Sequence, residues 1–468
     1  MRKTWAIAGV DLHLDLSGTR VRAAIETALR EAVRSGRLAP AARLPSSRTL
    51  AADLDVARNT VAEAYSQLVA EGWLTARVGS GTRVAERPGG AEESFAPVEA
   101  PARLARYDLR PGSPNLSAFP RTAWLAAARR ALDGAPDEAL GYSDPQGRPE
   151  LRRALADYLA RARGVRATAD RILICSGFTQ AFALLAEVLA KRESEPVLAI
   201  EEFTQPGIAQ VAVAKGLKLQ RLEVDERGAV VSELSNADAV LLTPAHQFPV
   251  GVPLDAERRS QVVDWARTRG GWVIEDDYDG EFRYDRQPLG ALQSRAPDQV
   301  IYAGTASKTL VPGLRLAWLV VPARLMGELV EAKAMADRQT ATLDQLTLAE
   351  LISSGNYDRQ IRRSRLDYRQ RRDRLISALQ EQVPEAHVTG IAAGLHALVD
   401  LPPGQSETDV VARAAEHGLA LEGLHSYAGP DARHNPALVV GYSAPPQHAY
   451  STAIARLCAV LAGSDAHR

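Results

Sequence analysis

The chain has 468 residues, enough for two to four domains of roughly 100–200 residues each, and its 46% hydrophobic and 24% charged residues exclude wholesale disorder and fibrous repeats. Two cysteines exclude a disulfide framework and have no zinc-ligand spacing, while no apolar run approaches the ~20 residues of a membrane span and the N-terminus lacks a signal peptide's apolar core. The net charge of −1 divides unevenly, because residues 1–87 carry 13 basic and 9 acidic side chains, a net +4, and the remainder carries −5. We therefore expect a cytoplasmic protein of two unlike parts, with no metal site and no membrane partner.

The first 87 residues predict three helices followed by a hairpin. After a short extended start, residues 21–37 carry apolar side chains at intervals of four. A serine cap precedes SSRTLAADL, ARNTVAEAYSQLVAEG carries a second apolar stripe, and WLTARVGSGTRVA alternates around a glycine-rich tip. This order is typical of a winged helix-turn-helix. Residues 88–105, rich in Pro, Gly, Ala and Glu, are expected to form a linker.

The second helix of a helix-turn-helix enters the major groove of DNA. This helix begins with Arg58, Asn59 and Thr60. Their side chains can bind guanine, adenine, and phosphate or methyl groups, respectively. Protein interaction is the alternative role of such a module. The candidate DNA-contacting residues are Arg48, Arg58, Asn59, Thr60, Arg77, Ser80, Gly81 and Thr82, with Arg83 beside them in the wing.

The stretch LPSSRTLAADLDVARNTVAEAYSQLVAEGWLTARVGSGTRV resembles the GntR-type winged helix of bacterial transcription regulators. The Pro-Ser-x-Arg start, the Arg-Asn-Thr-Val helix and the Gly-Ser-Gly-Thr wing each correspond. One departure is Ala62, where many members carry a second arginine. The resemblance implies that double-stranded operator DNA is a partner.

Beyond the linker, helices alternate with the short apolar runs RILIC, PVLAIE, AVLLTP, WVIEDD, QVIYAG and LAWLVVP. Continuous apolar runs of this length predict a mainly parallel sheet buried on both faces, in an α/β domain over residues 106–325. From about Met326 a long helix, several strands and a final helix predict a smaller α+β domain over residues 326–468.

Lys308 is one of only six lysines and follows the strand QVIYAG in a loop that includes Thr305 and Ser307. Ligands of α/β proteins bind at such strand ends, and an aldehyde cofactor needs a lysine to form a Schiff base. Arg315, shortly after, suits a phosphate. An ordinary surface lysine is the alternative.

At two further strand ends, side-chain and backbone groups suit the binding of a pyridine cofactor. Asp276 and Tyr278 leave one strand in alternation, as a carboxylate for the ring nitrogen and a phenol for the ring hydroxyl, unless EDDYD is only a helix-capping loop. The amides of Gly177, Phe178 and Thr179 open a helix after the strand RILIC, where they can hold a phosphate.

The order of these motifs resembles the fold-type I pyridoxal-phosphate enzymes of the aspartate aminotransferase superfamily, from about Tyr107 onwards. GYSDPQGRPELRRAL is a further match, and there the resemblance implies that Tyr142 reaches the cofactor phosphate of a neighbouring subunit. In TPAHQFPVG it implies that His246 or Gln247 replaces the asparagine that bonds the ring hydroxyl, with the choice left open.

A GntR-type winged helix joined to an aminotransferase-like domain resembles the MocR/GabR-type transcription regulators. The resemblance implies pyridoxal phosphate as cofactor, a head-to-tail homodimer, a small-molecule effector such as an amino compound, and action at the nucleoid. We therefore expect a regulator that senses pyridoxal phosphate without net turnover and controls vitamin B6 or amino-compound metabolism. The alternatives are an active aminotransferase with an accessory winged helix and a repressor that has lost the cofactor.

The sequence departs from the superfamily at two positions. Gln205 stands where an aromatic ring usually stacks on the cofactor, so either Phe203 substitutes or the stacking is lost. Val439 stands where an arginine usually holds the substrate carboxylate, and Arg433 is a nearby candidate to compensate. The second departure lowers the expectation of transamination and of an α-amino acid effector.

Overall fold

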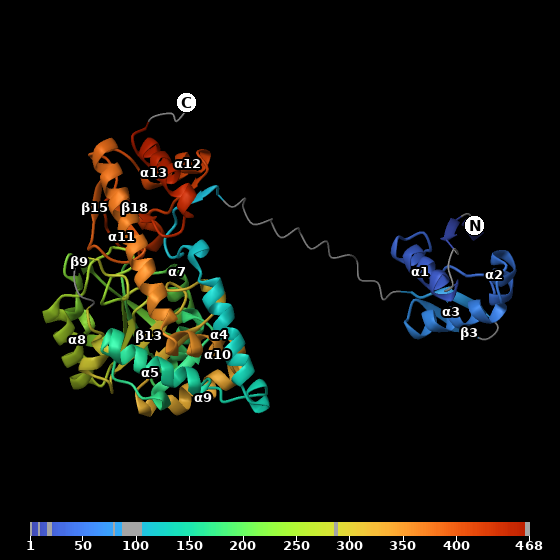
Figure 1. Ribbon diagram of the computed structural model, residues 1–468, viewed down its shortest axis with the longest axis horizontal. Helices are drawn as coiled ribbons and strands as arrows, with labels where there is room; N and C mark the ends of the chain where they lie inside the picture. The colour runs from blue at the N-terminus through green and yellow to red at the C-terminus, as the bar shows by residue number, and fades with distance from the viewer. Residues whose placement is uncertain are drawn as a thin grey trace. The chain divides into compact units, whose positions relative to one another are not determined.

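The computed structural model describes residues 2–7, 10–15, 21–77, 80–86, 105–284 and 289–463, with the side chains of residues 2–15 and of Ser235 left out of the description. The predicted linker therefore lies outside the described residues, apart from Ala105. The chain divides into two units, Met1–Arg103 and Leu104–Arg468, which Figure 1 colours blue and cyan to red. Within the described ranges, no helix is long and apolar enough to cross a membrane.

The smaller unit forms because three amphipathic helices bury their apolar stripes against a short hairpin. The predicted serine cap is Ser46, whose hydroxyl accepts a hydrogen bond from Thr49 N at 3.1 Å. Asp55 then takes a left-handed conformation, φ 55°, and turns the chain into the next helix, whose Val61 and Leu68 are fully buried. The elements are β1 (Arg2–Ile7), β2 (Val10–Asp15), α1 (Val21–Arg34), α2 (Ser47–Leu54), α3 (Arg58–Ala70), β3 (Leu74–Arg77) and β4 (Gly81–Val84).

A seven-stranded sheet forms the centre of the larger unit. Its order is β6 (Ile172–Cys175), β14 (Ala317–Val320), β13 (Val300–Thr305), β12 (Trp272–Asp276), β11 (Ala239–Leu242), β7 (Val197–Glu201) and β8 (Lys218–Leu222). All neighbouring strands run parallel except at β14, which is antiparallel to both of its neighbours. The predicted α/β fold class, with its mainly parallel sheet, is confirmed.

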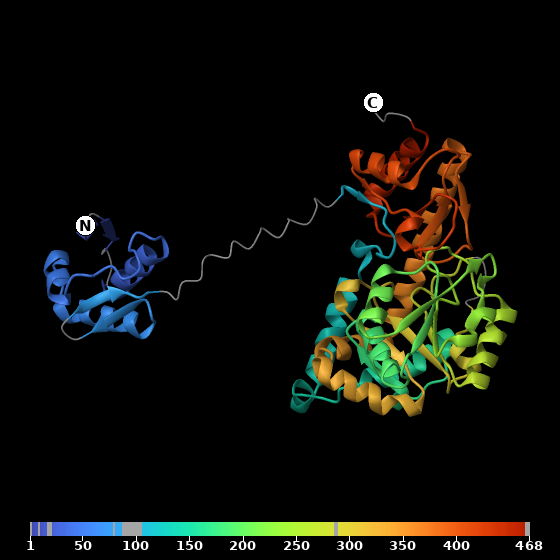
Figure 2. The ribbon, with the colours of Figure 1, turned by 180° about the vertical axis from the view of Figure 1, so that it is seen from behind.

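Helices cover both faces of this sheet, which is why its strands are apolar throughout (Figure 2). One face packs against α6 (Phe178–Ala190), α7 (Pro206–Ala214) and α9 (Ala323–Asp337). The other packs against α5 (Pro149–Arg163), α8 (Ala256–Arg269) and α10 (Thr342–Ser353). The helix α4 (Arg121–Gly134) lies against α10. The carboxyl ends of the parallel strands remain available for ligands.

The C-terminal part is a three-stranded antiparallel sheet with helices around its own apolar core. The short strand β5 (Tyr107–Asp108) pairs with β17 (Leu419–Ala420), so the first described residues after the linker join this part. Its other elements are α11 (Asn356–Gln382), β15 (His387–Thr389), β16 (His396–Asp400), α12 (Glu407–Glu416), β18 (Ala437–Gly441) and α13 (Gln447–Leu461).

Candidate functional site

A cavity of about 300 Å³ lies at the carboxyl ends of β7, β11, β12 and β13. Parallel strands end together at this edge, so residues far apart in the sequence meet there. The structure brings eight of the sequence-predicted cofactor residues to the cavity wall: Phe178, Thr179, Asp276, Tyr278, Thr305, Ser307, Lys308 and Arg315.

The amine of Lys308 lies at this cavity and donates a hydrogen bond to the backbone carbonyl of Gly112. Burial lowers the pKa of Lys308 below its usual 10.5, and the nearby carboxylates of Asp276 and Asp279 oppose that change. A lower pKa increases the fraction of neutral amine, which is the form that attacks an aldehyde.

Asp276 ends β12 and faces the same cavity. Burial raises the pKa of its carboxyl well above the usual value, Asp277 and Asp279 raise it further, and Lys308 opposes them. A protonated pyridine nitrogen beside Asp276 would restore the charged carboxylate, so this position fits a ring that must stay protonated. Asp277, the next residue, is held by a buried ion pair with Arg163 of α5, whose Nε lies 2.6 Å from its Oδ2. This pair fixes the loop that carries Asp276 and Tyr278.

The turn from β6 into α6 forms a cradle for an anion. Gly177 has φ 93°, and a Cβ at this position would lie 2.4 Å from the guanidinium of Arg315. Arg315 in turn donates to the carbonyl of Ser176 at 2.7 Å. First-turn amides of α6, a guanidinium and the hydroxyl of Ser307 thus converge, as a phosphate requires. The donor set of the cavity fits pyridoxal phosphate.

His246 and Gln247 do not line the cavity. His246 Nδ1 lies 2.8 Å from Asp279 Oδ2 and 3.0 Å from the Tyr278 hydroxyl. The side-chain amide of Gln247 donates to the carbonyls of Phe203 and Phe248 at 2.9 and 2.7 Å. Both side chains therefore support the loop around the cavity, whereas Phe248, the next residue, lines its wall.

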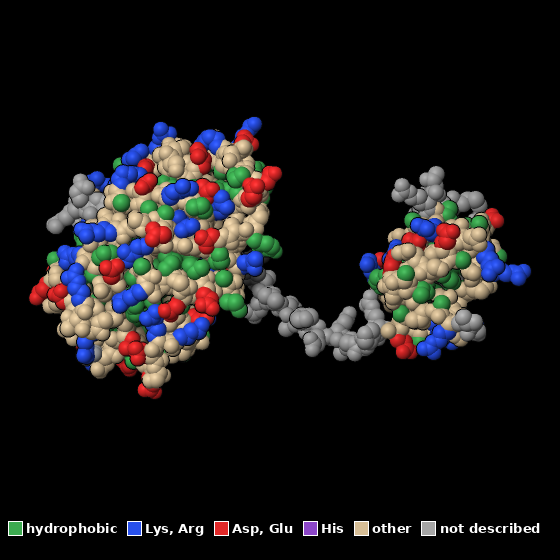
Figure 3. All heavy atoms as spheres, turned by 90° about the horizontal axis from the view of Figure 1, so that it is seen from below, with side chains coloured by type: hydrophobic (Ala, Val, Ile, Leu, Met, Phe, Trp, Pro, Cys, Tyr) green, Lys and Arg blue, Asp and Glu red, His purple; other side chains and the backbone are tan. Residues whose placement is uncertain are grey.

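Tyr142 also lies away from the cavity of its own chain. Its side chain is 82% exposed, with the guanidinium of Arg338 4.4 Å from the ring centre. Large exposed apolar residues share its region, on α4 and in the segment after it: Leu125, Leu132 and Leu140. Figure 3 shows hydrophobic side chains gathered on one face of the larger unit.

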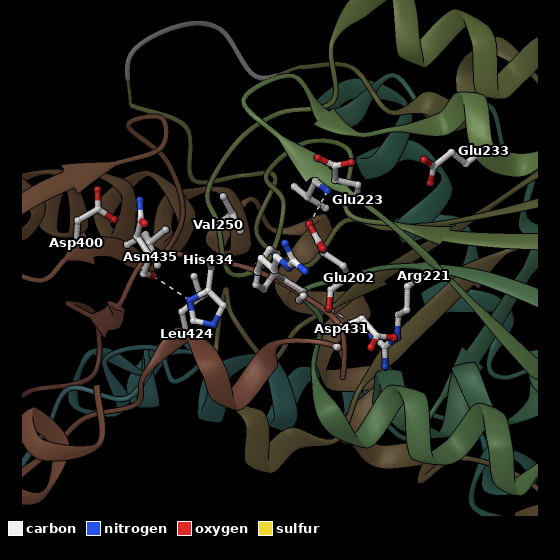
Figure 4. A pocket seen from close by; sticks show the side chains of 16 residues that line it. Glu202, Arg221, Glu223, Glu233, Val250, Asp400, Leu424, Asp431, His434 and Asn435 are labelled. Carbon is white, nitrogen blue, oxygen red and sulfur yellow. Dashed lines mark hydrogen bonds between the residues drawn. The ribbon is translucent and has the colours of Figure 1, made fainter. Parts of the chain in front are cut away.

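The structure places the two residues at which the sequence departs from the superfamily, Gln205 and Val439, and their candidate substitutes, Phe203 and Arg433. Gln205 lines the cavity, whereas Phe203 and Arg433 line a second cavity of about 620 Å³ between the end of β7 and the C-terminal part. Figure 4 shows this second cavity, where Glu202, Asp431 and other acidic side chains enter from several segments. Val439 is fully buried in an apolar cluster with Phe248. Phe203 does not reach the cofactor cavity, and Arg433 does not replace the missing arginine there.

The sequence interpretation missed several residues of the cavity wall, among them Gly112, Glu201 and His396. Glu201 ends the apolar strand PVLAIE, and a carboxylate at such a strand end is a signal that could have been used. Gly112 and His396 lie in segments without any comparable motif.

The predicted DNA-contacting residues lie on α2, α3 and the β3–β4 hairpin. Arg48, Arg58, Asn59 and Arg77 are exposed, while Thr60 is half-buried. In the wing, Ser80 and Gly81 are exposed and Thr82 is half-buried. Arg83 is exposed and donates to the carbonyl of Ala41 at 2.9 Å, which ties the wing to the segment before α2.

Two families match this chain. Residues 21–84 match "Bacterial regulatory proteins, gntR family", and residues 112–425 match "Aminotransferase class I and II". The pyridoxine biosynthesis regulator PdxR of Corynebacterium glutamicum is 32% identical, over 88% of this chain and 90% of that one. The protein named "Probable rhizopine catabolism regulatory protein MocR", from Rhizobium meliloti, is 32% identical over 73% and 74% of the two chains. The chain belongs to the MocR-type GntR regulators.

The larger unit of this MocR-type regulator has the fold of pyridoxal-phosphate enzymes. LysN, an α-aminoadipate aminotransferase from Thermus thermophilus solved with N-(5'-phosphopyridoxyl)-L-leucine, matches with a TM-score of 0.68 and 27% identity, over 76% of this chain and 92% of that one. The chain is therefore a DNA-binding transcription regulator whose larger unit is of the pyridoxal-phosphate-dependent aminotransferase family, as the sequence predicted.

Proposed function

We propose that this regulator responds to pyridoxal phosphate, held by Lys308 in the cavity described above. The observation that carries the proposal is the convergence of a buried amine, the Asp276 carboxyl and the Gly177–Arg315 cradle in one cavity. When bound, the cofactor supplies an aldehyde that reacts reversibly with amines. Lys308 holds that aldehyde, Asp276 keeps the ring nitrogen protonated, and the first turn of α6 with Arg315 neutralises the phosphate.

We further propose a role for each part of the chain and a homodimeric assembly. Residues 1–87 bind operator DNA at the nucleoid, and residues 88–105 form a linker between the two units. Residues 106–325 hold the cofactor, and residues 326–468 close over it. Exposed Tyr142 and its apolar neighbours support a head-to-tail homodimer in which Tyr142 reaches the partner's cofactor phosphate. An amino compound that enters the cavity acts as the effector.

Lys308→Ala tests the cofactor proposal. The purified protein should gain a visible absorbance band on titration with pyridoxal phosphate, and Lys308→Ala should lose it, because the covalent bond needs this amine. Lys191→Ala is the matched control, since Lys191 pairs with Glu187 on an exposed helix surface. A band that persists in Lys308→Ala would overturn the proposal, and steady turnover of an amino donor with a 2-oxo acid would favour a working aminotransferase.

Arg58→Ala tests the DNA-reading face. Loss of a side chain that reads a base should weaken binding by about 1–3 kcal/mol, measured by fluorescence anisotropy on fragments selected from the host genome for binding. Arg37→Ala is the control, because Arg37 is exposed in the turn after α1 and is not among the predicted DNA-contacting residues. Equal affinity of Arg58→Ala and the parent protein on every selected fragment would contradict the assignment.

A further inference from the structure

The side chain of Gln180 holds the turn between β6 and α6. Gln180 is the third residue of α6, and its Oε1 accepts a hydrogen bond from the backbone amide of Ser176 at 2.7 Å. A glutamine at the third helical position typically reaches back to an amide at the start of the helix. The bond therefore fixes the backbone of Ser176 relative to the first turn of α6, whose leading amides have no partner within the helix.

An acidic residue at the end of α9 orients the side-chain amide of Gln180. Asp337, the last residue of α9, accepts a hydrogen bond from Gln180 Nε2 at its Oδ2, at 2.6 Å. The carboxylate only accepts, so Nε2 faces it and Oε1 is left for the Ser176 amide. The other carboxylate oxygen lies 2.5 Å from Nζ of Lys333, whose side chain is fully buried and has no other polar contact among the described residues. A buried charge needs its partner, so Lys333 keeps the carboxylate in this place.

The same turn holds the guanidinium of Arg315. The carbonyl oxygen of Ser176 accepts a hydrogen bond from Arg315 Nη2 at 2.7 Å. Arg315 is an exposed residue, and in the part of the chain that the structure describes its guanidinium has no other hydrogen bond and no ion pair. A long exposed side chain is ordered only where another group holds it, and here that group is Ser176. Direct contacts therefore lead from Lys333 through Asp337, Gln180 and Ser176 to the cation that the proposed function assigns to the phosphate.

These contacts act on the phosphate end of the cavity. Arg315 lines the cavity, whereas Lys333, Asp337 and Gln180 are not among the described residues of its wall. The side-chain hydrogen bonds of these three residues join them to one another and to Ser176, and within the described residues none leads to the amine proposed to bind the aldehyde. Loss of the contacts should therefore weaken the binding of a phosphate group and leave the binding of the ring and the aldehyde.

We propose that Gln180 and Asp337 are positioning residues that set the preference of this regulator for pyridoxal phosphate over pyridoxal, which lacks the phosphate. They hold Ser176, and through it the Arg315 guanidinium, in place before the phosphate arrives. A cation that is already ordered binds more tightly than one that loses its freedom on binding. The inference rests on the proposed function, because a phosphate reaches this turn only if the cofactor occupies the cavity.

Gln180→Met tests the inference, because methionine has a similar length and lacks the amide that makes both hydrogen bonds. The full-length protein is titrated with pyridoxal phosphate and, separately, with pyridoxal, and the visible band gives a dissociation constant for each. Borohydride reduction followed by mass spectrometry detects bound pyridoxal where its band is weak. We expect the variant to bind pyridoxal phosphate about tenfold more weakly than the parent protein and pyridoxal within about twofold, since hydrogen bonds to charged groups are the strong ones.

A second variant, Lys333→Met with Asp337→Leu, removes the ion pair without leaving a buried charge unpaired. It should show the same selective loss at about threefold, because Gln180 keeps its bond to Ser176 and loses only the partner that orients its amide. Gln261→Met is the matched control, at an exposed glutamine of α8, and should keep both dissociation constants within about twofold of the parent. Bound pyridoxal in each variant reports that its cavity has folded.

The inference is overturned if Gln180→Met weakens the binding of both aldehydes by the same factor, the result of a merely structural role, which includes the loss of both. It is also overturned if the parent protein binds the two aldehydes equally, or if Gln180→Met keeps the parent preference. These results are distinct from a failure of the proposed function, in which the parent protein shows no visible band with pyridoxal phosphate or Lys308→Ala keeps it.

Discussion

Two buried carboxyl groups, those of Glu201 and Glu275, lie near the carboxyl ends of β7 and β12, and Glu201 lines the cofactor cavity. Burial raises the pKa of Glu201 to about 7, although hydrogen bonds from Thr243 and Gln247 oppose it. Burial also raises the pKa of Glu275 to about 7, with a further rise from the charge of Asp277. Each group is more easily protonated in the folded chain than in the unfolded chain, so folding takes up protons between pH 4.5 and about 7.

Glu201→Gln should therefore flatten the pH dependence of stability. The contribution of Glu201 is fully present below its ordinary pKa of 4.5 and is lost as the pH rises through about 7, in total on the order of 3 kcal/mol. An amide does not ionise, so the Tm of the larger unit should fall less between pH 5 and 8 in the variant, as measured by scanning calorimetry. Exposed Glu223→Gln is the control, and parallel curves for Glu201→Gln and the parent protein would contradict the prediction.

At the scale of elements, the site depends on short connections between strands and helices. The turn between β6 and α6 contains only Ser176 and Gly177, and its left-handed glycine lets the Arg315 guanidinium come close to the backbone. Arg315 itself has φ 51°, a conformation that a non-glycine residue adopts at a cost of order 1–3 kcal/mol. The cradle is therefore assembled from two turns that each require an unusual backbone conformation.

Gly177→Ala should weaken pyridoxal phosphate binding by about tenfold to a hundredfold, because the added Cβ displaces Arg315 and strains the turn. Fluorescence or absorbance titration measures the affinity. Gly164→Ala is a matched control, since Gly164 has φ 70° but open space around its Cβ position. The control should lose stability and keep its cofactor affinity, and equal affinity losses in the two variants would contradict the role of the cradle.

The sequence was sufficient for the elements whose patterns are local. The central strands are apolar throughout, so they were predicted, whereas β8 has the half-exposed pattern of an edge strand in KLQRL and was missed. Lys308 and Asp276 were found because each follows an apolar strand in a recognisable motif. His396 was not, because a lone histidine at the start of an apolar strand is typical of a core residue, and its proximity to Lys308 arises only from the packing of the C-terminal part against the sheet.

At the scale of the whole molecule, the two units have separate cores and separate chemistry. The smaller unit buries Ile25, Leu50 and Leu68 within its own cluster, which contains only residues of that unit. Its net charge of +4 suits DNA, whereas the remainder of the chain carries a net charge of −5, which disfavours nonspecific attraction to DNA. In the proposed dimer, two DNA-reading units are linked and bind two half-sites together.

A fragment of residues 1–86 should fold and bind DNA weakly. Its own core supports folding, but it loses the dimer contacts of the larger unit, so its affinity should fall at least about a hundredfold relative to the full chain. Circular dichroism checks folding, and anisotropy on one selected DNA fragment measures affinity. A fragment of residues 105–468 is the counterpart, which should remain dimeric and keep the visible band. Equal DNA affinity of the 1–86 fragment and the full chain would contradict the linked arrangement.

The pairing of β6 with β14 has a consequence for synthesis on the ribosome. β6 comes early in the larger unit, but its sheet neighbour β14 is made only after every other strand of that sheet. At about 5–20 residues per second, the helices and hairpin of the smaller unit are complete roughly 10–50 s before β14 emerges. Each new chain therefore has a folded DNA-binding unit before it has a finished sheet to hold the cofactor.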